Sequence, residues 1–134
     1  MARINQWRAQ GADCRSGGRY AAAPALVWNG LLTAAAGGHS QDMALRNYFS
    51  HTSADGRTLA ARVDATGYAW SRLGENIAAG YPSVNAVVDG WMASDGHCAN
   101  VMNPELRDVG LACVPGAASS TYRTYWTMDL GKPR

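Results

Sequence analysis

Apolar residues recur at helical spacing through the first two-thirds of the chain. Residues 26–47 carry one apolar stripe at intervals of three or four positions, which predicts a long helix with one buried face. The stripe consists of Leu32, Ala36, His39 and Met43. A short helix is also predicted over residues 3–10, whereas residues 11–25 are rich in Gly, Ala, Arg and Pro and predict an irregular segment.

Two further helices have recognisable start signals. Thr58 can cap a helix that runs to about Ala65, and Ser83 can cap a strongly periodic helix. The second helix places Trp91 on its apolar face, and Ser94 continues that face three residues later. A helical turn over residues 97–102 is expected to follow.

The apolar period changes to two in the last third of the chain. Residues 109–114 alternate as a strand does, and residues 122–130 are dense in Tyr, Thr and Trp. The turn-rich residues 115–120 between them predict an antiparallel pair of adjacent strands. Residues 68–79 are expected to form a loop that enters a short strand. Helices first and a hairpin last predict an α+β layered fold.

Length and composition exclude several classes of protein. We expect one domain over residues 1–134, with residues 1–25 as an N-terminal helix and lead-in, because this length matches a single domain. A net charge of +2, with scattered basic residues, gives no sign of nucleic-acid binding. No apolar run reaches the ~18 residues of a membrane span, so an integral membrane protein is not expected.

The three cysteines, Cys14, Cys98 and Cys113, bear on the compartment. They permit one disulfide and one unpaired thiol, although three buried thiols are the alternative. The first residues contain no signal peptide. A disulfide would favour a secreted or periplasmic protein whose signal peptide has been removed, and this is our expectation.

Three short clusters in the middle of the chain each carry one side chain suited to catalysis or metal binding. His51 ends Tyr48-Phe49-Ser50-His51, Glu75 lies within Gly74-Glu75-Asn76, and His97 follows Asp95-Gly96. Taken singly, each has a structural explanation: His51 suits a helix end, and Glu75 is a half-buried carboxylate that needs a partner. His39, on an apolar stripe, is expected to be a core residue. Together, two imidazoles and a carboxylate suit a zinc site or an acid–base site.

These clusters make the sequence similar to a known family. It resembles the CAP superfamily of cysteine-rich secretory, antigen 5 and pathogenesis-related class 1 proteins, especially its bacterial secreted single-domain members. The likeness continues through Gly90-Trp91-Met92, Gly96-His97-Cys98 and Tyr125-Trp126-Thr127. It implies a three-layer α–β–α sandwich with a small antiparallel sheet.

The resemblance also implies a central cleft that contains two histidines and two glutamates in eukaryotic members. His51, Glu75 and His97 match three of those positions, and Ser94 replaces the fourth. The expected cavity is therefore formed by these four residues, with a divalent metal, most simply zinc, weakly bound by the two histidines. A disulfide between Cys98 and Cys113 is implied as well, leaving Cys14 unpaired.

Two functions follow from the resemblance. The first is a secreted binding or effector module that takes a lipid, a sterol or an extracellular partner, for which five tryptophans and six tyrosines could line a groove. The alternative is a metal-dependent hydrolase, a protease or esterase, in which Glu75 acts as general base. No general enzymatic activity is established for the family, so the resemblance does not imply catalysis by this protein. We therefore lean towards a protein that is not an enzyme.

Overall fold

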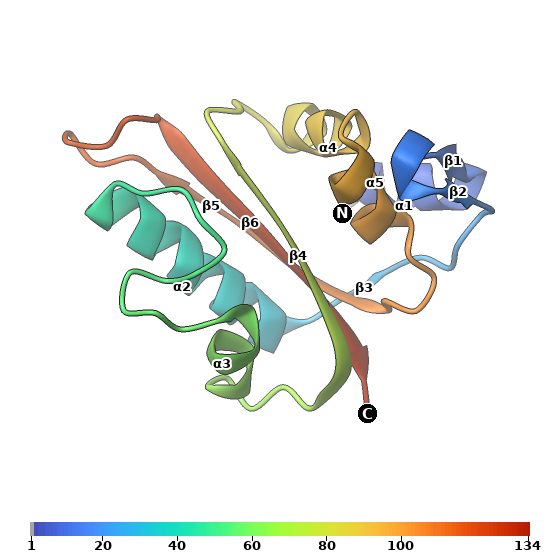
Figure 1. Cartoon of the computed structure of the whole chain (residues 1–134), viewed down its shortest axis with the longest axis horizontal. Helices are drawn as coiled ribbons and strands as arrows, with labels where there is room; N and C mark the ends of the chain where they lie inside the picture. Colours follow the sequence, from blue (N-terminus) through green and yellow to red (C-terminus); the bar gives the residue numbers. More distant parts are fainter. Residues whose placement is uncertain (1) are drawn as a thin grey trace.

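The computed structural model describes residues 2–134 and stacks its helices on the two faces of a four-stranded sheet (Figure 1). Met1, the first residue of the expected lead-in, lies outside the described residues. The helices are α1 (Ala2–Gln10), the 3₁₀ helix η1 (Arg15–Gly17), α2 (Gly30–Arg46), α3 (Leu59–Asp64), α4 (Val84–Met92) and α5 (Asp95–Met102). The strands are β1 (Ala12–Asp13), β2 (Arg19–Tyr20), β3 (Val27–Trp28), β4 (Trp70–Ala79), β5 (Asp108–Pro115) and β6 (Thr124–Pro133).

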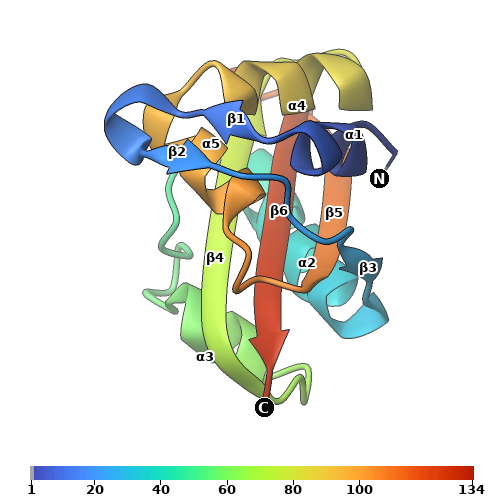
Figure 2. The same cartoon turned by 90° about the vertical axis from the view of Figure 1, so that its right-hand side faces the viewer.

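The main sheet has the order β3-β5-β6-β4, with β6 antiparallel to both of its neighbours (Figure 2). The predicted adjacent pair over residues 109–114 and 122–130 is confirmed. Two features were not predicted. The short strand β3 adds to β5 in parallel orientation, and β4 is a full ten-residue strand because it pairs along almost the whole of β6.

The helices divide between the two faces of this sheet. In Figures 1 and 2, α2 and α3 lie on one side, and α1, α4 and α5 lie on the other with the small β1–β2 hairpin. Helix α2 approaches β5 very closely, since a Cβ built on Gly110 would lie 2.1 Å from the Thr33 backbone nitrogen. The α+β fold class and the three-layer arrangement are therefore confirmed.

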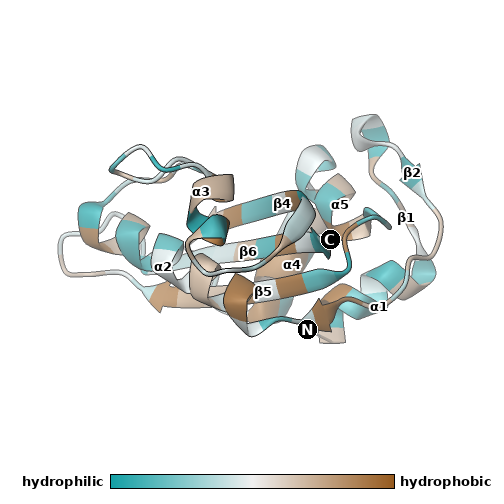
Figure 3. Ribbon diagram, turned by 90° about the horizontal axis from the view of Figure 1, so that it is seen from below, coloured by the Kyte–Doolittle hydropathy of each residue, from teal (hydrophilic) through white to brown (hydrophobic). Residues whose placement is uncertain are grey.

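Most of the hydrophobic core lies on the α1/α4/α5 side of the sheet. One large cluster joins those helices to β5 and β6, and its fully buried members include Val87, Val101, Met128 and Leu130. The α2/α3 side contains two smaller clusters instead, one around Leu32 and one around Met43. Figure 3 shows hydrophobic positions along the central strands, while α2 alternates hydrophobic and hydrophilic stretches. Within residues 2–134, no helix is long and apolar enough to cross a membrane.

The predicted starts of α3 and α4 are correct, but the helix predicted over residues 26–47 begins only at Gly30, because residues 27–28 form β3, and the predicted end of α4 is also wrong. Thr58 caps α3 through the Ala61 N–H, and Ser83 caps α4 through the Ala86 N–H. Helix α4, however, ends at Met92, and Ser94 has an extended backbone as the N-cap residue of α5. Ser94 therefore begins the next helix and does not continue the apolar face of α4.

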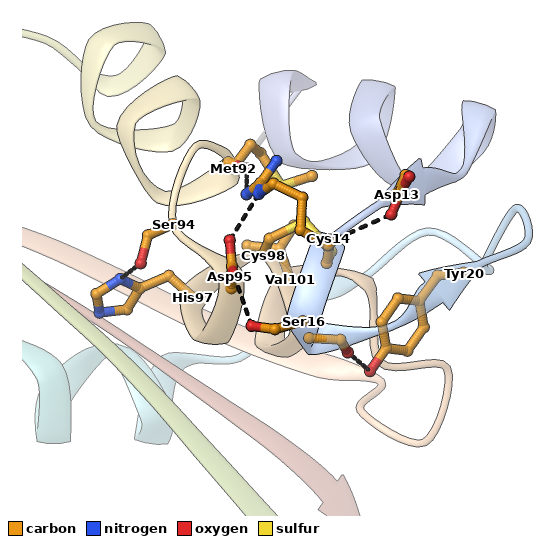
Figure 4. The surroundings of a disulfide bond; sticks show 12 residues. Asp13, Cys14, Ser16, Tyr20, Met92, Ser94, Asp95, His97, Cys98 and Val101 are labelled. Carbon is orange, nitrogen blue, oxygen red and sulfur yellow. Dashed lines mark hydrogen bonds and ion pairs between the residues drawn. A yellow bond between two sulfur atoms is a disulfide. The ribbon is translucent and has the colours of Figure 1, made fainter.

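The expected disulfide between Cys98 and Cys113 is wrong. Cys98 is bonded to Cys14, with 5.5 Å between their Cα atoms, and Cys113 is a free, exposed cysteine on β5 (Figure 4). Both bonded cysteines are fully buried in the large core cluster, where the segment after α1 packs against α5. The N-terminal lead-in, expected to be irregular, is therefore covalently tied to the core.

Arg8 holds the same N-terminal segment in place by hydrogen bonds. It is fully buried, and its guanidinium donates to four backbone carbonyls, those of Pro24, Val101, Asn103 and Leu106. Burial and the charge of Arg107 lower the pKa of Arg8. Buried polar groups normally have hydrogen-bond partners, and this one joins α1 to the loop between α5 and β5.

Candidate functional site

The Gly74-Glu75-Asn76 cluster lies on β4, an edge strand of the main sheet. Successive side chains of a strand point to opposite faces, so neighbouring residues of this cluster act on different layers. Glu75 meets side chains on the α2/α3 side, and Asn76 meets α5 on the other side. This one motif thereby positions both candidate histidines.

Glu75 is buried and fully engaged. Its Oε1 accepts a hydrogen bond from His51 Nδ1 at 2.8 Å, and its Oε2 accepts one from Arg62 Nη2 at 2.6 Å. Burial alone would raise the pKa of Glu75, but hydrogen bonds with His51 and with the neighbouring Asp129 carboxyl group, together with the positive charge of Arg62, lower it to about 2. Because a carboxylate accepts only, His51 carries a proton on Nδ1, and in the neutral form of the ring Nε2 is the lone pair.

Arg62 was not singled out from the sequence, yet it organises this side of the site. From α3 it also donates to the His51 carbonyl at 2.6 Å and to Ser53 Oγ at 3.2 Å. The side chains of Arg62 and Glu75 are almost entirely buried, so the pair is not an exposed salt bridge of little consequence. No sequence signal identified it, because an arginine in a short helix is usually a solvated residue.

Asp129 was also missed. It lies directly opposite Glu75 in the β4–β6 register and is completely buried. No donor within residues 2–134 reaches either carboxyl oxygen, and the carboxyl group lies against that of Glu75. Burial raises the pKa of Asp129 well above its usual value, and the neighbouring Glu75 carboxylate adds to that effect. Two opposed carboxyl groups in a buried position cannot both ionise easily, so Asp129 is the protonated member of the pair.

His97 is placed by the other half of the motif. Asn76 donates to the His97 carbonyl at 3.1 Å, and Asn100 donates to Asn76 Oδ1 at 2.9 Å. The ring nitrogen Nδ1 of His97 lies 2.9 Å from Ser94 Oγ, as Figure 4 shows. Burial lowers the pKa of His97, and the positive charge that His51 carries when it is protonated lowers it further. His97 is therefore a neutral imidazole at physiological pH.

A cleft of about 300 Å³ opens beside His97. Its walls are mainly apolar and aromatic, and they include Phe49, Tyr81, Trp91, Ser94, His97 and Tyr122. Ser94 and His97 lie on the cleft wall, whereas His51 and Glu75, which were expected to form the same cavity, do not line it. The structure thus joins His51 to Glu75 and His97 to Ser94, and it places only the second pair in the cleft.

The residues present suit a metal ion only in part. Each histidine uses Nδ1 locally and leaves Nε2 without a hydrogen bond within residues 2–134, as a ligating imidazole requires. Each Glu75 oxygen already accepts one hydrogen bond, from His51 or from Arg62, and the side chain is buried. No group of three or more His, Cys, Asp or Glu side chains in the described chain is arranged to hold a metal. Two imidazoles fit a weakly held ion and fall short of the three or four protein ligands of typical zinc sites.

Comparisons with known proteins agree with this architecture. Curated relatives include the uncharacterized membrane protein YlbC of Bacillus subtilis, 36% identical over 86 residues, which are 64% of this chain and 25% of that protein. The uncharacterized protein YkwD of the same organism is 36% identical over 102 residues, 75% of this chain and 37% of that protein. This chain therefore spans well under half the length of both relatives.

Solved structures show the same fold. An extracellular protein containing an SCP domain from Bacillus anthracis superposes with a TM-score of 0.71 at 32% identity, covering 82% of this chain and 34% of that one. An outer surface protein of Borrelia burgdorferi gives a TM-score of 0.74 at 19% identity, covering 84% of this chain and 80% of that one, which shows the fold alone.

The family model for the cysteine-rich secretory protein family, CAP, matches residues 1–130. This match includes the N-terminal segment bound by Cys14 as well as the sheet and both histidines. The chain belongs to the CAP family of cysteine-rich secretory proteins.

Proposed function

We propose that this chain is an extracellular binding module whose aromatic cleft takes an amphipathic lipid or sterol. The observation that carries the proposal is the cleft itself, in which aromatic rings surround one polar imidazole, that of His97. Such a cavity buries an apolar body while a few polar groups orient the ligand's polar end. The disulfide and the extracellular or outer-surface descriptions of similar structures support a location outside the cytoplasm.

Two exposed aromatic side chains at the cleft are well placed to contact such a ligand. Phe49 and Tyr122 keep half or nearly half of their surface exposed, although both are large and apolar. At the base of the cleft, a Cβ on Gly90 would come 2.5 Å from the Tyr81 hydroxyl, so Gly90 lets the Tyr81 ring pack closely there. A ligand that covers these rings would remove exposed apolar surface at about 25 cal/mol per Å².

A fluorescent fatty acid, dansyl-undecanoic acid, tests the proposal by direct titration. We expect saturable binding that weakens about tenfold in Tyr122→Ser, a loss of about 1.4 kcal/mol. Trp28→Ser is the matched control, because Trp28 and Tyr122 are both 45% exposed but Trp28 lies on β3, away from the cleft. Equal weakening in both variants, or no saturation in the wild type, contradicts the proposal.

We further propose that His51 and His97 bind a divalent metal such as zinc weakly through their Nε2 atoms. A metal there would supply a positive charge for the polar end of a ligand. The hydrolase alternative gains less support, because a Glu75 with a pKa of about 2 and both oxygens occupied is a poor general base. Zinc binding should decline below about pH 6, because protonated imidazoles no longer act as metal ligands.

Isothermal titration calorimetry with zinc tests the metal proposal separately from the lipid proposal. We expect the affinity to fall at least about tenfold in His51→Ala and in His97→Ala. If all three proteins bind zinc equally, the metal proposal fails while the lipid proposal remains open to its own test.

A further inference from the structure

The N-cap serines of α4 and α5 use their hydroxyl groups differently. Ser83 Oγ accepts a hydrogen bond from the Ala86 N–H and thereby caps α4. Ser94 Oγ makes no such bond to α5 and lies 2.9 Å from His97 Nδ1 instead. Because a serine at this position normally accepts from the backbone of its own helix, the Ser94 hydroxyl is free for another role.

A molecule in the aromatic cleft can reach both Ser94 and His97. Both side chains line the cleft and are partly exposed. No Asp, Glu, Lys or Arg is among the described residues that line it. Asp95, which follows Ser94 in the chain, is held by Arg15 Nε and by Ser16 Oγ, each at 2.6 Å (Figure 4). The cleft therefore presents a hydroxyl group beside an imidazole, in mainly apolar surroundings.

The contact between Ser94 and His97 suits a nucleophile and its base. When the ring proton of His97 is on Nε2, the Ser94 hydroxyl donates to the lone pair of Nδ1. Their separation of 2.9 Å lies within the roughly 2.6–3.2 Å over which a base activates a serine. A metal on His97 Nε2 would require the ring proton to be on Nδ1, so the metal-bound form and this form of the site exclude each other.

The start of α5 supplies backbone donors next to Ser94. The N–H groups of Asp95, Gly96 and His97 have no hydrogen-bond acceptor within residues 2–134. The first backbone bond of the helix runs from the Cys98 N–H to the Ser94 carbonyl, at 2.8 Å. Free N–H groups at a helix N-terminus attract negative charge. They would stabilise the negative oxygen that forms when Ser94 attacks a carbonyl group.

We propose that Ser94 and His97 hydrolyse an uncharged carboxylic ester whose apolar acyl chain occupies the aromatic cleft. The reaction uses neither a metal nor Glu75. An uncharged ester fits because no charged side chain lines the cleft, and a charged group buried there would lack a partner. This inference rests on the proposed function only in that the same cleft takes the apolar chain.

The reaction has two steps. Ser94 Oγ forms a bond to the ester carbonyl carbon while its proton passes to His97 Nδ1, and the bond to the alcohol oxygen then breaks as the alcohol takes that proton. A water molecule next gives a proton to His97 Nδ1 and attacks the acyl carbon. The bond to Ser94 Oγ then breaks, and the serine recovers the proton. Ester and water thus become a carboxylic acid and an alcohol, with no other reactant.

Hydrolysis of p-nitrophenyl butyrate in the presence of EDTA tests the proposal. We expect a saturable rate in the wild type, and a loss of at least about a hundredfold in kcat/KM in Ser94→Ala and in His97→Ala. Ser83→Ala is the matched control and should keep the wild-type rate, because Ser83 is also an N-cap serine but does not line the cleft. A rate that does not saturate, or equal rates in Ser94→Ala and Ser83→Ala, overturns the proposal.

A covalent label tests Ser94 in the wild type, so the result does not depend on the folding of Ser94→Ala. Diisopropyl fluorophosphate forms a bond between its phosphorus and the oxygen of an activated serine and releases fluoride. We expect mass spectrometry to find this adduct on Ser94 and to find none in His97→Ala. The absence of an adduct on Ser94 in the wild type contradicts the proposal.

The binding of dansyl-undecanoic acid to the same protein separates this inference from the proposed function. Saturable binding of the fatty acid without hydrolysis of the ester overturns the inference and leaves the lipid proposal standing. Hydrolysis that depends on Ser94, without saturable binding of the fatty acid, supports the inference and contradicts the lipid proposal.

Discussion

The two faces of the main sheet are built in different ways. The face covered by α1, α4 and α5 is mostly apolar, although Arg8 and Asn76 are buried there, and the Cys14–Cys98 disulfide and the hydrogen bonds of Arg8 hold it together. The face covered by α2 and α3 has small apolar clusters at either end, with buried polar groups between them. Those groups include His39, Arg62, Glu75, Thr127 and Asp129.

Because of this difference, the first face mainly stabilises the fold, whereas the second face positions polar side chains. Apolar burial stabilises the first face without directional requirements, whereas each buried polar group on the second face needs a partner. Within the described residues 2–134, His39 Nδ1 and Arg62 Nε have no partner, and no donor reaches the oxygens of Asp129. Strand β4 contributes to both faces. Its Glu75 accepts a hydrogen bond from His51 on the α2/α3 side, and its Asn76 donates to the His97 carbonyl on the other side. The cleft lies beside β4, whose Ile77, Ala78 and Ala79 line it together with His97.

The largest effect is expected on the apolar face, from removal of the disulfide. The double variant Cys14→Ser/Cys98→Ser releases a cross-link between residues separated by 84 positions. On the chain-entropy model this lowers the free energy of unfolding by about 4.5 kcal/mol. Denaturant titration measures the loss. Cys113→Ser is the control and should stay within about 0.5 kcal/mol of the wild type, since Cys113 is exposed and unbonded. A greater loss for Cys113→Ser would contradict the assigned pairing.

The next largest effect is expected on the polar face, from Arg62→Met. This change leaves the buried Glu75 carboxylate without its cation and should cost about 3 kcal/mol at neutral pH. Glu75 has a lowered pKa, so its ionic partners stabilise the fold above about pH 4, and this contribution is lost as the pH falls towards 2. Arg62→Met should therefore flatten the acid limb of stability.

The exposed pair of Arg57 and Asp55 supplies the comparison for that variant. Arg57→Met should cost less than about 1 kcal/mol, because exposed ion pairs contribute little. Urea unfolding at several pH values measures both variants. Equal losses in the free energy of unfolding would show that the buried pair stabilises the fold no more than the exposed pair does.

The smallest effect, of opposite sign, is expected from Asp129→Asn. A raised pKa means that the folded state keeps a proton that the unfolded state releases above about pH 4, so Asp129 costs progressively more stability as the pH rises. Asn removes that cost, and the melting temperature should rise by a few °C at about pH 7 and hardly change at about pH 4. Asp55→Asn, at an exposed position, should show no such dependence. A fall in melting temperature for Asp129→Asn at neutral pH would contradict the protonated state.

Several parts of the molecule were predictable from the sequence because local rules govern them. The apolar periods and the caps at Thr58 and Ser83 gave α3, α4 and the β5–β6 pair, since each depends on neighbours within a few residues. The family motifs led to the three-layer fold and to His51, Glu75 and His97 as the residues of interest. The hydrogen bond between His51 and Glu75 agrees with the expectation that the carboxylate needs a partner.

Only the tertiary structure decided the contacts between distant segments. The partner of Cys98 is 84 residues away, where the N-terminal segment packs against α5, and no local pattern encodes that approach. Arg62 and Asp129 meet Glu75 from a short helix and a neighbouring strand, each in a sequence context typical of ordinary surface or strand residues. The chain alone specified which segments are helices and strands, because those depend on local sterics and periodic burial. Which polar groups are buried together depends on how the layers stack, and this determined the surroundings of Glu75 and of both histidines.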